Sequence, residues 1–250
     1  MDMQPHIRCK REDAAKYAVL PGDPQRVERA KKYLENVREI VFNREYRSIT
    51  GYYKGTKILV MSTGMGGVSV GIAVEELKNI GVETMIRIGS CGALQKDIHL
   101  GELIIATGAV RDEGTSKAYV ESTYPAIPDT ELVCSMIETA KECGVTYHVG
   151  KVRSHDTFYT EREEEISRYW SKKGILGADM ETAALFVVGD LRGIKTASIL
   201  NTVNEYDMDV AENINNYVNG EEQTARGERD EILTAFETCV RMEQRSAQNS

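Results

Sequence analysis

The segment IRIGSCGAL (86–94) decides the fold class, because it joins a strand pattern to a glycine-rich turn. It begins as an apolar, β-branched run and ends in GSCG (89–92), with one charged residue, Arg87, inside the run. A guanidinium in a buried strand is costly unless it meets an anion. Arg87 therefore either pairs with a core carboxylate or binds a phosphate together with Ser90 and the glycine N–H groups.

Further short apolar runs lie on both sides of this segment and predict strands. With the segment itself included, the runs cover residues 57–63, 84–90, 102–110, 145–152, 174–180 and 196–203. Helical patterns occur at 24–34, 69–81, 129–144, 181–193 and 228–244. The alternation predicts an α/β fold, a sandwich in which helices cover both faces of a largely parallel central sheet.

The organisation of the chain indicates one domain over residues 1–250, because neither a linker nor an internal repeat interrupts it. Residues 1–15 form an N-terminal arm ahead of the first strand. Two polar stretches stand out: 160–173 predicts a short helix, and 205–227 predicts a loop before the last helix. Both follow strands, where α/β proteins usually place their active-site loops.

Composition restricts the class of protein further. The 250 residues are 41% hydrophobic and 28% charged, which is typical of soluble globular domains. The formal charge of -8 argues against non-specific nucleic-acid binding, which needs a basic surface. No run approaches the roughly 18 apolar residues of a membrane span, and the start lacks a secretory signal. The five cysteines contain no C-x-x-C, so neither disulfides nor a zinc site are indicated, and we expect a cytoplasmic protein.

Two glycine-rich turns precede helices. In LPGDPQRVERA (20–30), Gly22 permits close backbone approach, and the helix start, with Arg26 beyond it, can bind an anion. The alternative is a plain strand-to-helix turn. In STGMGGVSVGIAVEEL (62–77) the dinucleotide fingerprint G-x-G-x-x-G fails at Ser69, so a nicotinamide cofactor is only weakly supported. This second turn either lets a ligand approach the backbone or simply reverses the chain.

The segment GADMETAALF (177–186) places Asp179 and Glu181 where a strand joins a helix. The helix dipole alone favours acids there. The functional alternative is a Glu181 carboxylate that accepts hydrogen bonds from sugar hydroxyls, with Met180 as an apolar floor beneath the ring. No metal-binding spacing such as H-E-x-x-H occurs, so we expect no catalytic metal.

Six motifs together resemble the nucleoside phosphorylase family of hexameric bacterial purine nucleoside phosphorylases and uridine phosphorylases. In order they are PGDPQR (21–26), NREYRSITGYYKG (43–55), STGMGG (62–67), RIGSCGA (87–93), SHDTFY (154–159) and ADMETAAL (178–185). The resemblance implies a single α/β domain whose central mixed sheet curls toward a barrel. It also implies homodimers that share active sites and assemble as trimers of dimers. The implied reaction is reversible phosphorolysis of an N-glycosidic bond, with inorganic phosphate as co-substrate and without metal or organic cofactor.

The same resemblance implies roles for individual residues. The implied phosphate site comprises Gly22, Arg26, Arg87 and Ser90, joined by Arg44 from the neighbouring subunit. The implied ribose site comprises Met65, Met180 and Glu181, capped by His6 from the neighbour's arm. Phe158 is similar to the aromatic residue that covers the base.

The residues that select the base depart from both patterns of the family. Purine members carry Ser-Asp after the sixth strand, where the acid supports protonation of the base at N7, and here the pair is Asn204-Glu205. Uridine members carry Gln-x-Arg for the uracil edge, and here Arg162 and Glu164 occupy those places. Either Asn204 or Glu205 is expected to assist the leaving base, and Arg162 is a further base-binding candidate.

Segment lengths argue both ways on the base. The segment 158–181 is short, as in purine enzymes, whereas the segment 62–114 is more like that of the uridine enzymes. We expect a slight preference for purine nucleosides.

Two alternative functions differ in kind from a phosphorylase: a hydrolytic nucleosidase and a non-catalytic nucleoside-binding protein. The three arginines Arg26, Arg44 and Arg87 favour phosphate, because a water nucleophile does not need three guanidinium groups. The candidate catalytic residues are Arg87, Glu181, Asn204 and Glu205.

Overall fold

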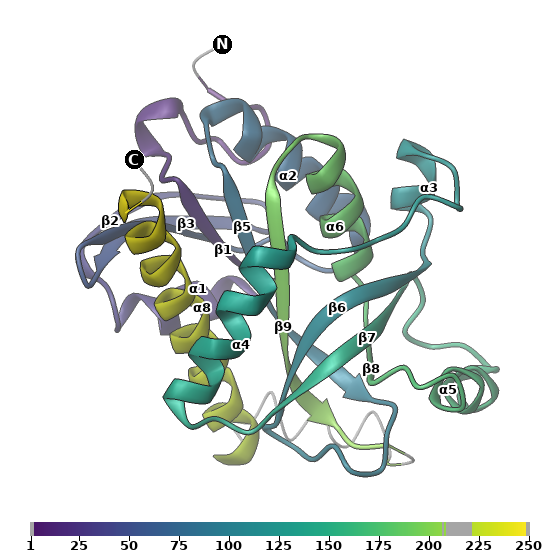
Figure 1. The fold of residues 1–250 in the computed structure, drawn as a ribbon. Helices are drawn as coiled ribbons and strands as arrows, with labels where there is room; N and C mark the ends of the chain where they lie inside the picture. The colour runs from purple at the N-terminus through teal and green to yellow at the C-terminus, as the bar shows by residue number, and fades with distance from the viewer. Residues whose placement is uncertain (1–2, 207, 209–221, 249–250) are drawn as a thin grey trace.

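The structure is a computed structural model that describes residues 3–206, 208 and 222–248 (Figure 1). A short 3-10 turn, η1 (Arg11–Asp13), precedes the first strand. The elements that follow are β1 (Tyr17–Pro21), α1 (Pro24–Lys31), β2 (Glu35–Asn43), β3 (Tyr46–Tyr53), β4 (Thr56–Met61), α2 (Gly67–Ile80), β5 (Thr84–Ala93), β6 (Leu103–Asp112), α3 (Thr115–Tyr119), α4 (Thr130–Cys143), β7 (Tyr147–His155), α5 (Glu163–Ser171), β8 (Gly177–Asp179), α6 (Thr182–Leu191), β9 (Lys195–Asn204) and α8 (Glu222–Gln248).

The strands of the described part of the chain form one nine-stranded mixed sheet in the order β2-β3-β4-β1-β5-β8-β7-β6-β9. β1 runs parallel to β4 and β5, and β5 runs parallel to β9. β9 also pairs antiparallel with β6, so β5, β8, β7, β6 and β9 close into a ring. The predicted α/β fold with a mixed sheet that curls toward a barrel is therefore confirmed, and the curl reaches closure.

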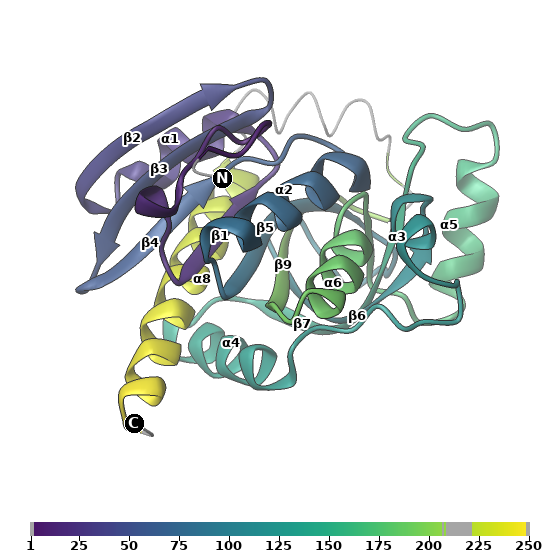
Figure 2. The same ribbon diagram turned by 90° about the horizontal axis from the view of Figure 1, so that it is seen from above.

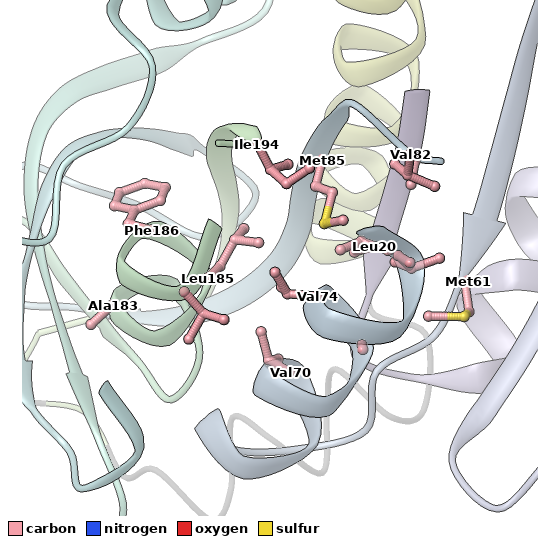
Figure 3. Packing of buried hydrophobic residues seen from close by; sticks show 14 of the residues in the cluster. Leu20, Met61, Val70, Val74, Val82, Met85, Ala183, Leu185, Phe186 and Ile194 are labelled. Carbon is pink, nitrogen blue, oxygen red and sulfur yellow. The ribbon is translucent and has the colours of Figure 1, made fainter. Parts of the chain in front are cut away.

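Helices cover the sheet on both sides, as Figure 2 shows. On one side, α2 and α6 pack through buried residues such as Val70 and Leu185 (Figure 3). On the other side, α1, α4 and α8 bury a second cluster that includes Val27, Met136 and Phe236. Burial of each such side chain contributes about 1.5–3 kcal/mol. No helix within residues 3–206 and 222–248 combines the length and the hydropathy needed to cross a membrane.

Local sequence explains where the helices begin and end. At α1, Pro24 occupies the first turn and the Asp23 side chain accepts a hydrogen bond from the Gln25 backbone N–H at 2.9 Å. The helix α4 begins in the same way at Asp129 and ends at Gly144, whose φ is 68°. Glycine adopts this left-handed conformation without the steric cost of a Cβ atom.

The predicted strands and helices are present, with small displacements of their ends. The sequence patterns missed β2, β3 and the short helix α3. β2 is largely exposed and contains no continuous apolar run. The sheet is therefore less parallel than the apolar runs indicate, since β3 pairs antiparallel with both β2 and β4. The last helix begins at Glu222, so residues 222–227 are helical where a loop was expected. Residues 207 and 209–221 of that predicted loop lie outside the described residues.

Candidate active site

Arg87 lies in β5, and its guanidinium lies over Gly89, two residues further along the strand. A Cβ atom on Gly89 would lie 2.6 Å from Arg87 Cζ, so glycine leaves the room that the guanidinium occupies. Arg87 Nε donates to Asp179 Oδ2 at 3.0 Å, and Nη2 donates to Glu181. The third nitrogen, Nη1, is buried and has no hydrogen-bond partner among the described residues. Arg87 thus pairs with core carboxylates and still offers a donor to a further acceptor.

The two carboxylates reach Arg87 from the junction of β8 and α6. Asp179 accepts a hydrogen bond from the Thr182 backbone N–H, the first of α6, at 3.0 Å, which agrees with the dipole interpretation of an acid at this end of the helix. Glu181 is buried and accepts a hydrogen bond from the Gly66 N–H at 2.6 Å. Burial raises the pKa of Glu181 above its ordinary value, and the positive charge of Arg87 opposes that rise.

The turns that follow β1 and β4 lie against each other. The Gly64 N–H donates to the Gly22 carbonyl at 2.9 Å, and a Cβ atom on Gly22 would lie 3.1 Å from the Gly64 carbonyl. Gly64 and Gly66 have φ values of 72° and 88°, which favour glycine. Because Gly66 also donates to Glu181, these turns bring main chain against the carboxylate that Arg87 contacts.

Arg26 of α1 is buried next to the strand that carries Arg87. Its Nη1 donates to the Ile88 carbonyl at 3.1 Å. Arg26 Nε lies 3.2 Å from Glu228 Oε2, and Nη1 lies 3.1 Å from Glu231 Oε1, both on α8. No sequence motif pointed to these two acids. The available signal was their position, three residues apart, on the apolar face of the last helical pattern.

Three further phosphate and ribose candidates differ in how exposed their side chains are. They are Ser90 in β5, Met65 in the second glycine-rich turn and Met180 at the β8–α6 junction. Ser90 is half-buried in β5, three residues after Arg87. Met180 is half-buried between the two acids of the junction. Met65 is 87% exposed in the turn after β4, so its side chain makes little contact within this chain.

Arg44 and His6 lie apart from Arg87 and its two carboxylate partners. By family resemblance, both are expected to act in the site of a neighbouring subunit. Arg44 is exposed between β2 and β3, has a φ of 56°, and forms no ion pair with a described residue. His6 Nδ1 lies 2.6 Å from Glu76 Oε1, and the backbone N–H groups of His6 and Ile7 donate to the same carboxylate. Asn43 donates to the His6 carbonyl at 2.7 Å, so the arm is fixed on α2 and β2.

Two of the base candidates flank the start of α5. Phe158 is 37% exposed and packs edge-on against Tyr159, with ring centroids 5.1 Å apart. Arg162 lies at the N-terminus of α5 and its Nε contacts Glu165 Oε2 at 3.0 Å. Both members of this ion pair are largely in solvent, so the Arg162 side chain lies along its own helix rather than toward Arg87 and its carboxylate partners.

The other two base candidates follow each other at the end of β9. Asn204 is opposite Gly92 of β5, and its Nδ2 would lie 3.8 Å from a Cβ atom on that glycine. Glu205 accepts a hydrogen bond from the Leu100 N–H at 3.1 Å and lies 3.3 Å from His99 Nδ1. Asn204 is therefore beside the strand that carries Arg87, whereas Glu205 is bound to the turn before β6.

These contacts form two sets of three buried charged side chains, one around Arg26 and one around Arg87, which together are called the buried charge cluster. Its members are Arg26, Arg87, Asp179, Glu181, Glu228 and Glu231. Charged donors in a buried place bind anions with directional hydrogen bonds, and a carboxylate such as Glu181 accepts hydrogen bonds from hydroxyls. Among the described residues, no group of three or more His, Cys, Asp or Glu is arranged to bind a metal ion.

Comparison with known proteins adds an independent finding. The sequence profile of the Phosphorylase superfamily matches residues 16–236. A uridine phosphorylase of Thermococcus kodakarensis is 44% identical over 79% of this chain and 76% of its own length. A guanosine phosphorylase of Halorubrum lacusprofundi is 39% identical over 80% of this chain and 82% of its own length. The crystal structure of a uridine phosphorylase from Vibrio fischeri superposes with a TM-score of 0.90 at 49% identity, covering 96% of this chain and 98% of the other.

Proposed function

The chain belongs to the phosphorylase superfamily, and from this premise we propose that it cleaves nucleosides with phosphate, giving free base and pentose 1-phosphate. The observation that carries the site assignment is the buried contact between Arg87 and Glu181. This contact supports the proposal, because a guanidinium that can bind phosphate lies next to a carboxylate that can accept hydrogen bonds from sugar hydroxyls, and the reaction requires the two substrates side by side.

In the proposed phosphate site, Arg87 and Arg26 provide the charge. Arg87 Nη1 is the donor without a partner among the described residues, and guanidinium groups bind phosphate oxygens with paired, charge-assisted hydrogen bonds. Ser90 and the main chain at Gly22 line the same site. Arg44 joins it from a second copy of the chain, as the family resemblance implies, and its exposure between β2 and β3 leaves it accessible to another copy.

In the proposed ribose site, Glu181 accepts hydrogen bonds from the sugar hydroxyls and Met180 lies beneath the ring. Met65 adds apolar contact, and His6 of a second copy covers the sugar. Substrate binding separates the contact between Arg87 and Glu181, because phosphate oxygens replace the carboxylate at Nη2 and hydroxyls replace the guanidinium. Each charged group therefore keeps a partner before and after binding, which limits the desolvation cost.

The proposed reaction is a substitution at the anomeric carbon. A phosphate oxygen forms a bond to C1′ while the C1′–N bond breaks and its electron pair moves to the base. The sugar acquires oxocarbenium character, so orientation of the two substrates and the nearby negative charge of phosphate lower the barrier. The base accepts a proton or hydrogen bond as it leaves.

For the base, 6-oxopurine nucleosides such as inosine are the first candidate, because the Asn204 amide lies beside β5 and is able to donate to N7. Glu205 donates there only in its protonated form, and Phe158 covers the base. Uridine is the second candidate, because uridine phosphorylases are among the compared proteins. Its carbonyl oxygens need donors, and Arg162 is the cationic candidate if it leaves Glu165.

The proposal extends to the assembly and the setting of the enzyme. We expect one domain over residues 1–250. Two chains form a homodimer with shared active sites, and three dimers associate into a hexamer. The enzyme acts in the cytoplasm, with inorganic phosphate as co-substrate and with neither a metal nor an organic cofactor.

One assay separates the candidate functions. Purified protein is incubated with inosine, guanosine, adenosine or uridine, with and without phosphate, and the free base is measured. Base release that depends on phosphate, with pentose 1-phosphate as co-product, is expected. Release without phosphate would indicate a nucleosidase, and absence of release with every nucleoside would indicate a binding protein. The ratio of kcat/KM for inosine and uridine, in wild type and Arg162→Ala, decides the base.

A further inference from the structure

Glu228 and Glu231 are the two buried acids that contact Arg26. Neither has a part in the phosphorolysis described above. They lie on one face of α8, and Glu231 is 0% exposed. Both contact the same guanidinium, Glu228 at Nε and Glu231 at Nη1. Because Arg26 is the second phosphate-binding arginine of the proposed site, any change of charge on these acids acts directly on that site.

The position of these acids is fixed by the contact between α8 and the sheet. Asn201 of β9 donates from Nδ2 to the Thr224 carbonyl at 2.8 Å. A Cβ atom on Gly227 would lie 2.7 Å from the Gly101 carbonyl oxygen, so the helix backbone packs directly on the turn before β6. The carboxyl groups therefore reach Arg26 from a rigid support.

The two acids differ in their partners. Glu228 is shared by Arg26 and Arg29, whose Nη2 donates to it at 3.0 Å, and two guanidinium groups stabilise its ionised form. Neither carboxyl oxygen of Glu231 has a hydrogen-bond partner among the described residues, although Oε1 lies 3.1 Å from Arg26 Nη1. Burial removes the hydration of an ionised carboxylate there, and the nearby Arg26 guanidinium replaces it only in part, so the ionised form is costly.

The groups that surround Glu231 come from every element packed against it. They are Arg26 of α1, Arg87 and Cys91 of β5, the Asn201 backbone of β9 and Glu228 of the same helix. Burial raises the pKa of Glu231 to about 8, against the opposing charge of Arg26. Burial also raises the pKa of Cys91, so this thiol is uncharged at neutral pH. Near pH 7, Glu231 therefore retains its proton, and it ionises as the pH rises past its pKa.

We propose that Glu231 is a positioning residue that controls how Arg26 meets phosphate. When protonated, Glu231 packs beside the guanidinium and adds no negative charge to that of Glu228. When ionised, it adds a second carboxylate at Arg26 and competes with phosphate for this guanidinium. This inference rests on the proposed function, because it takes Arg26 as a phosphate ligand. Its consequence is that affinity for a dianion falls as Glu231 loses its proton.

The test measures sulfate binding by calorimetry, since sulfate stays a dianion over the whole range while phosphate changes its own charge. The series runs from about pH 6.5 to 9.5, which brackets the ionisation of Glu231. Wild type is compared with Glu231→Gln, which removes the ionisation, and with Glu237→Gln. The control Glu237→Gln removes an acid of the same helix that contacts Tyr53 and Lys54 instead. KM for phosphate and for the nucleoside is measured in parallel.

Wild type and Glu237→Gln are expected to lose about tenfold in sulfate affinity across the series, and Glu231→Gln less than about twofold. The nucleoside KM at saturating phosphate is expected to follow the same pH profile in all three proteins. A wild type with constant sulfate affinity, or a Gln variant that loses affinity as steeply, would overturn the proposal. If Glu231→Gln does not fold, Glu231→Leu gives the same comparison with an apolar side chain. Absence of phosphorolysis in wild type would refute the proposed function, whereas the sulfate series reports on Glu231 independently.

Discussion

Arg87 is charged inside an apolar strand, and its surroundings explain how that charge is tolerated. Two carboxylates neutralise it, and the absent side chain of Gly89 provides the space for its guanidinium. The same arrangement leaves Nη1 without a hydrogen-bond partner among the described residues. A buried donor of this kind costs free energy until an acceptor arrives, which supports the proposed binding of an anion there.

Gly89→Ala is expected to raise the KM for phosphate about tenfold, because the new Cβ atom displaces the Arg87 guanidinium. Steady-state kinetics with varied phosphate checks this. The matched control is Gly92→Ala in the same strand, where a Cβ atom would lie 3.8 Å from Asn204 Nδ2, an ordinary contact distance. A KM for phosphate that stays at the wild-type value in Gly89→Ala would show that the position of Arg87 does not matter for phosphate.

Glu181→Gln is expected to lower kcat/KM for ribonucleosides about 10²–10³-fold, because a charged acceptor of hydroxyl hydrogen bonds becomes a neutral amide of equal size. The change also removes a partner of Arg87, so phosphate affinity is measured as well. Glu75→Gln, which alters an ion pair with Arg192 on the surface of α2, serves as the control. Equal kcat/KM in wild type and Glu181→Gln would refute the ribose assignment.

The helix α8 contributes to the candidate site although none of its residues belongs to a recognised motif. Its buried face includes both apolar residues such as Ile232 and Phe236 and the acids Glu228 and Glu231. An amphipathic pattern explains the apolar contacts with the sheet, whereas the acids are balanced there by arginines of α1, Arg26 for both acids and Arg29 for Glu228. The first and last helices of the described chain are thus joined through charge as well as packing.

Gly227→Ala tests the contact of α8 with the sheet. Alanine in a helix interior normally stabilises by up to about 1 kcal/mol relative to glycine. Here the expected sign is reversed, with a loss of about 2–4 kcal/mol in the free energy of unfolding, because the Cβ atom would collide with Asn201 and with the Gly101 backbone. Chemical denaturation measures the change, and Gly71→Ala in α2 is the comparison. A stabilised Gly227→Ala protein would contradict the close approach.

In the proposed function, Arg44 and His6 act only in an assembly of chains. Within one chain, Arg44 is exposed and forms no ion pair with a described residue, and His6 is fixed to Glu76 on α2. Two apolar side chains are exposed as well: Phe42, two residues before Arg44, is 63% exposed, and Met65, in the turn after β4, is 87% exposed. Apolar side chains that water surrounds in one chain favour contact with a second copy.

Mixed dimers of Arg44→Ala and Arg87→Ala subunits test whether sites are shared. Each variant alone is expected to be inactive, whereas a mixed dimer contains one site with both arginines intact and regains part of the activity. Subunits are exchanged under mild denaturation, and exchange is verified by a size tag on one partner. Mixed dimers that form but stay inactive would place Arg44 outside the site.

The sequence by itself determined the succession of strands and helices and the positions of Gly22, Arg87 and Glu181 at strand and turn boundaries. These features are encoded locally, because hydrophobic period, glycine and capping residues act over a few neighbouring positions. The family resemblance supplied the mixed, curling sheet. Whether Arg87 binds a carboxylate or an anion stayed open, because that choice depends on groups that are far away along the chain.

Only the tertiary structure decided the contacts between distant segments. The ring closes because β9 pairs with both β5 and β6, and an exposed strand such as β2 has no apolar signature. Arg26 and Glu228 are 202 positions apart, and no local pattern relates them. The role of Gly89 likewise appears only once Arg87 folds over it. Long-range packing and charge pairing depend on which surfaces the folded chain brings together. Hydrophobic periodicity and local motifs therefore specify the helices and strands, but not which distant residues come into contact.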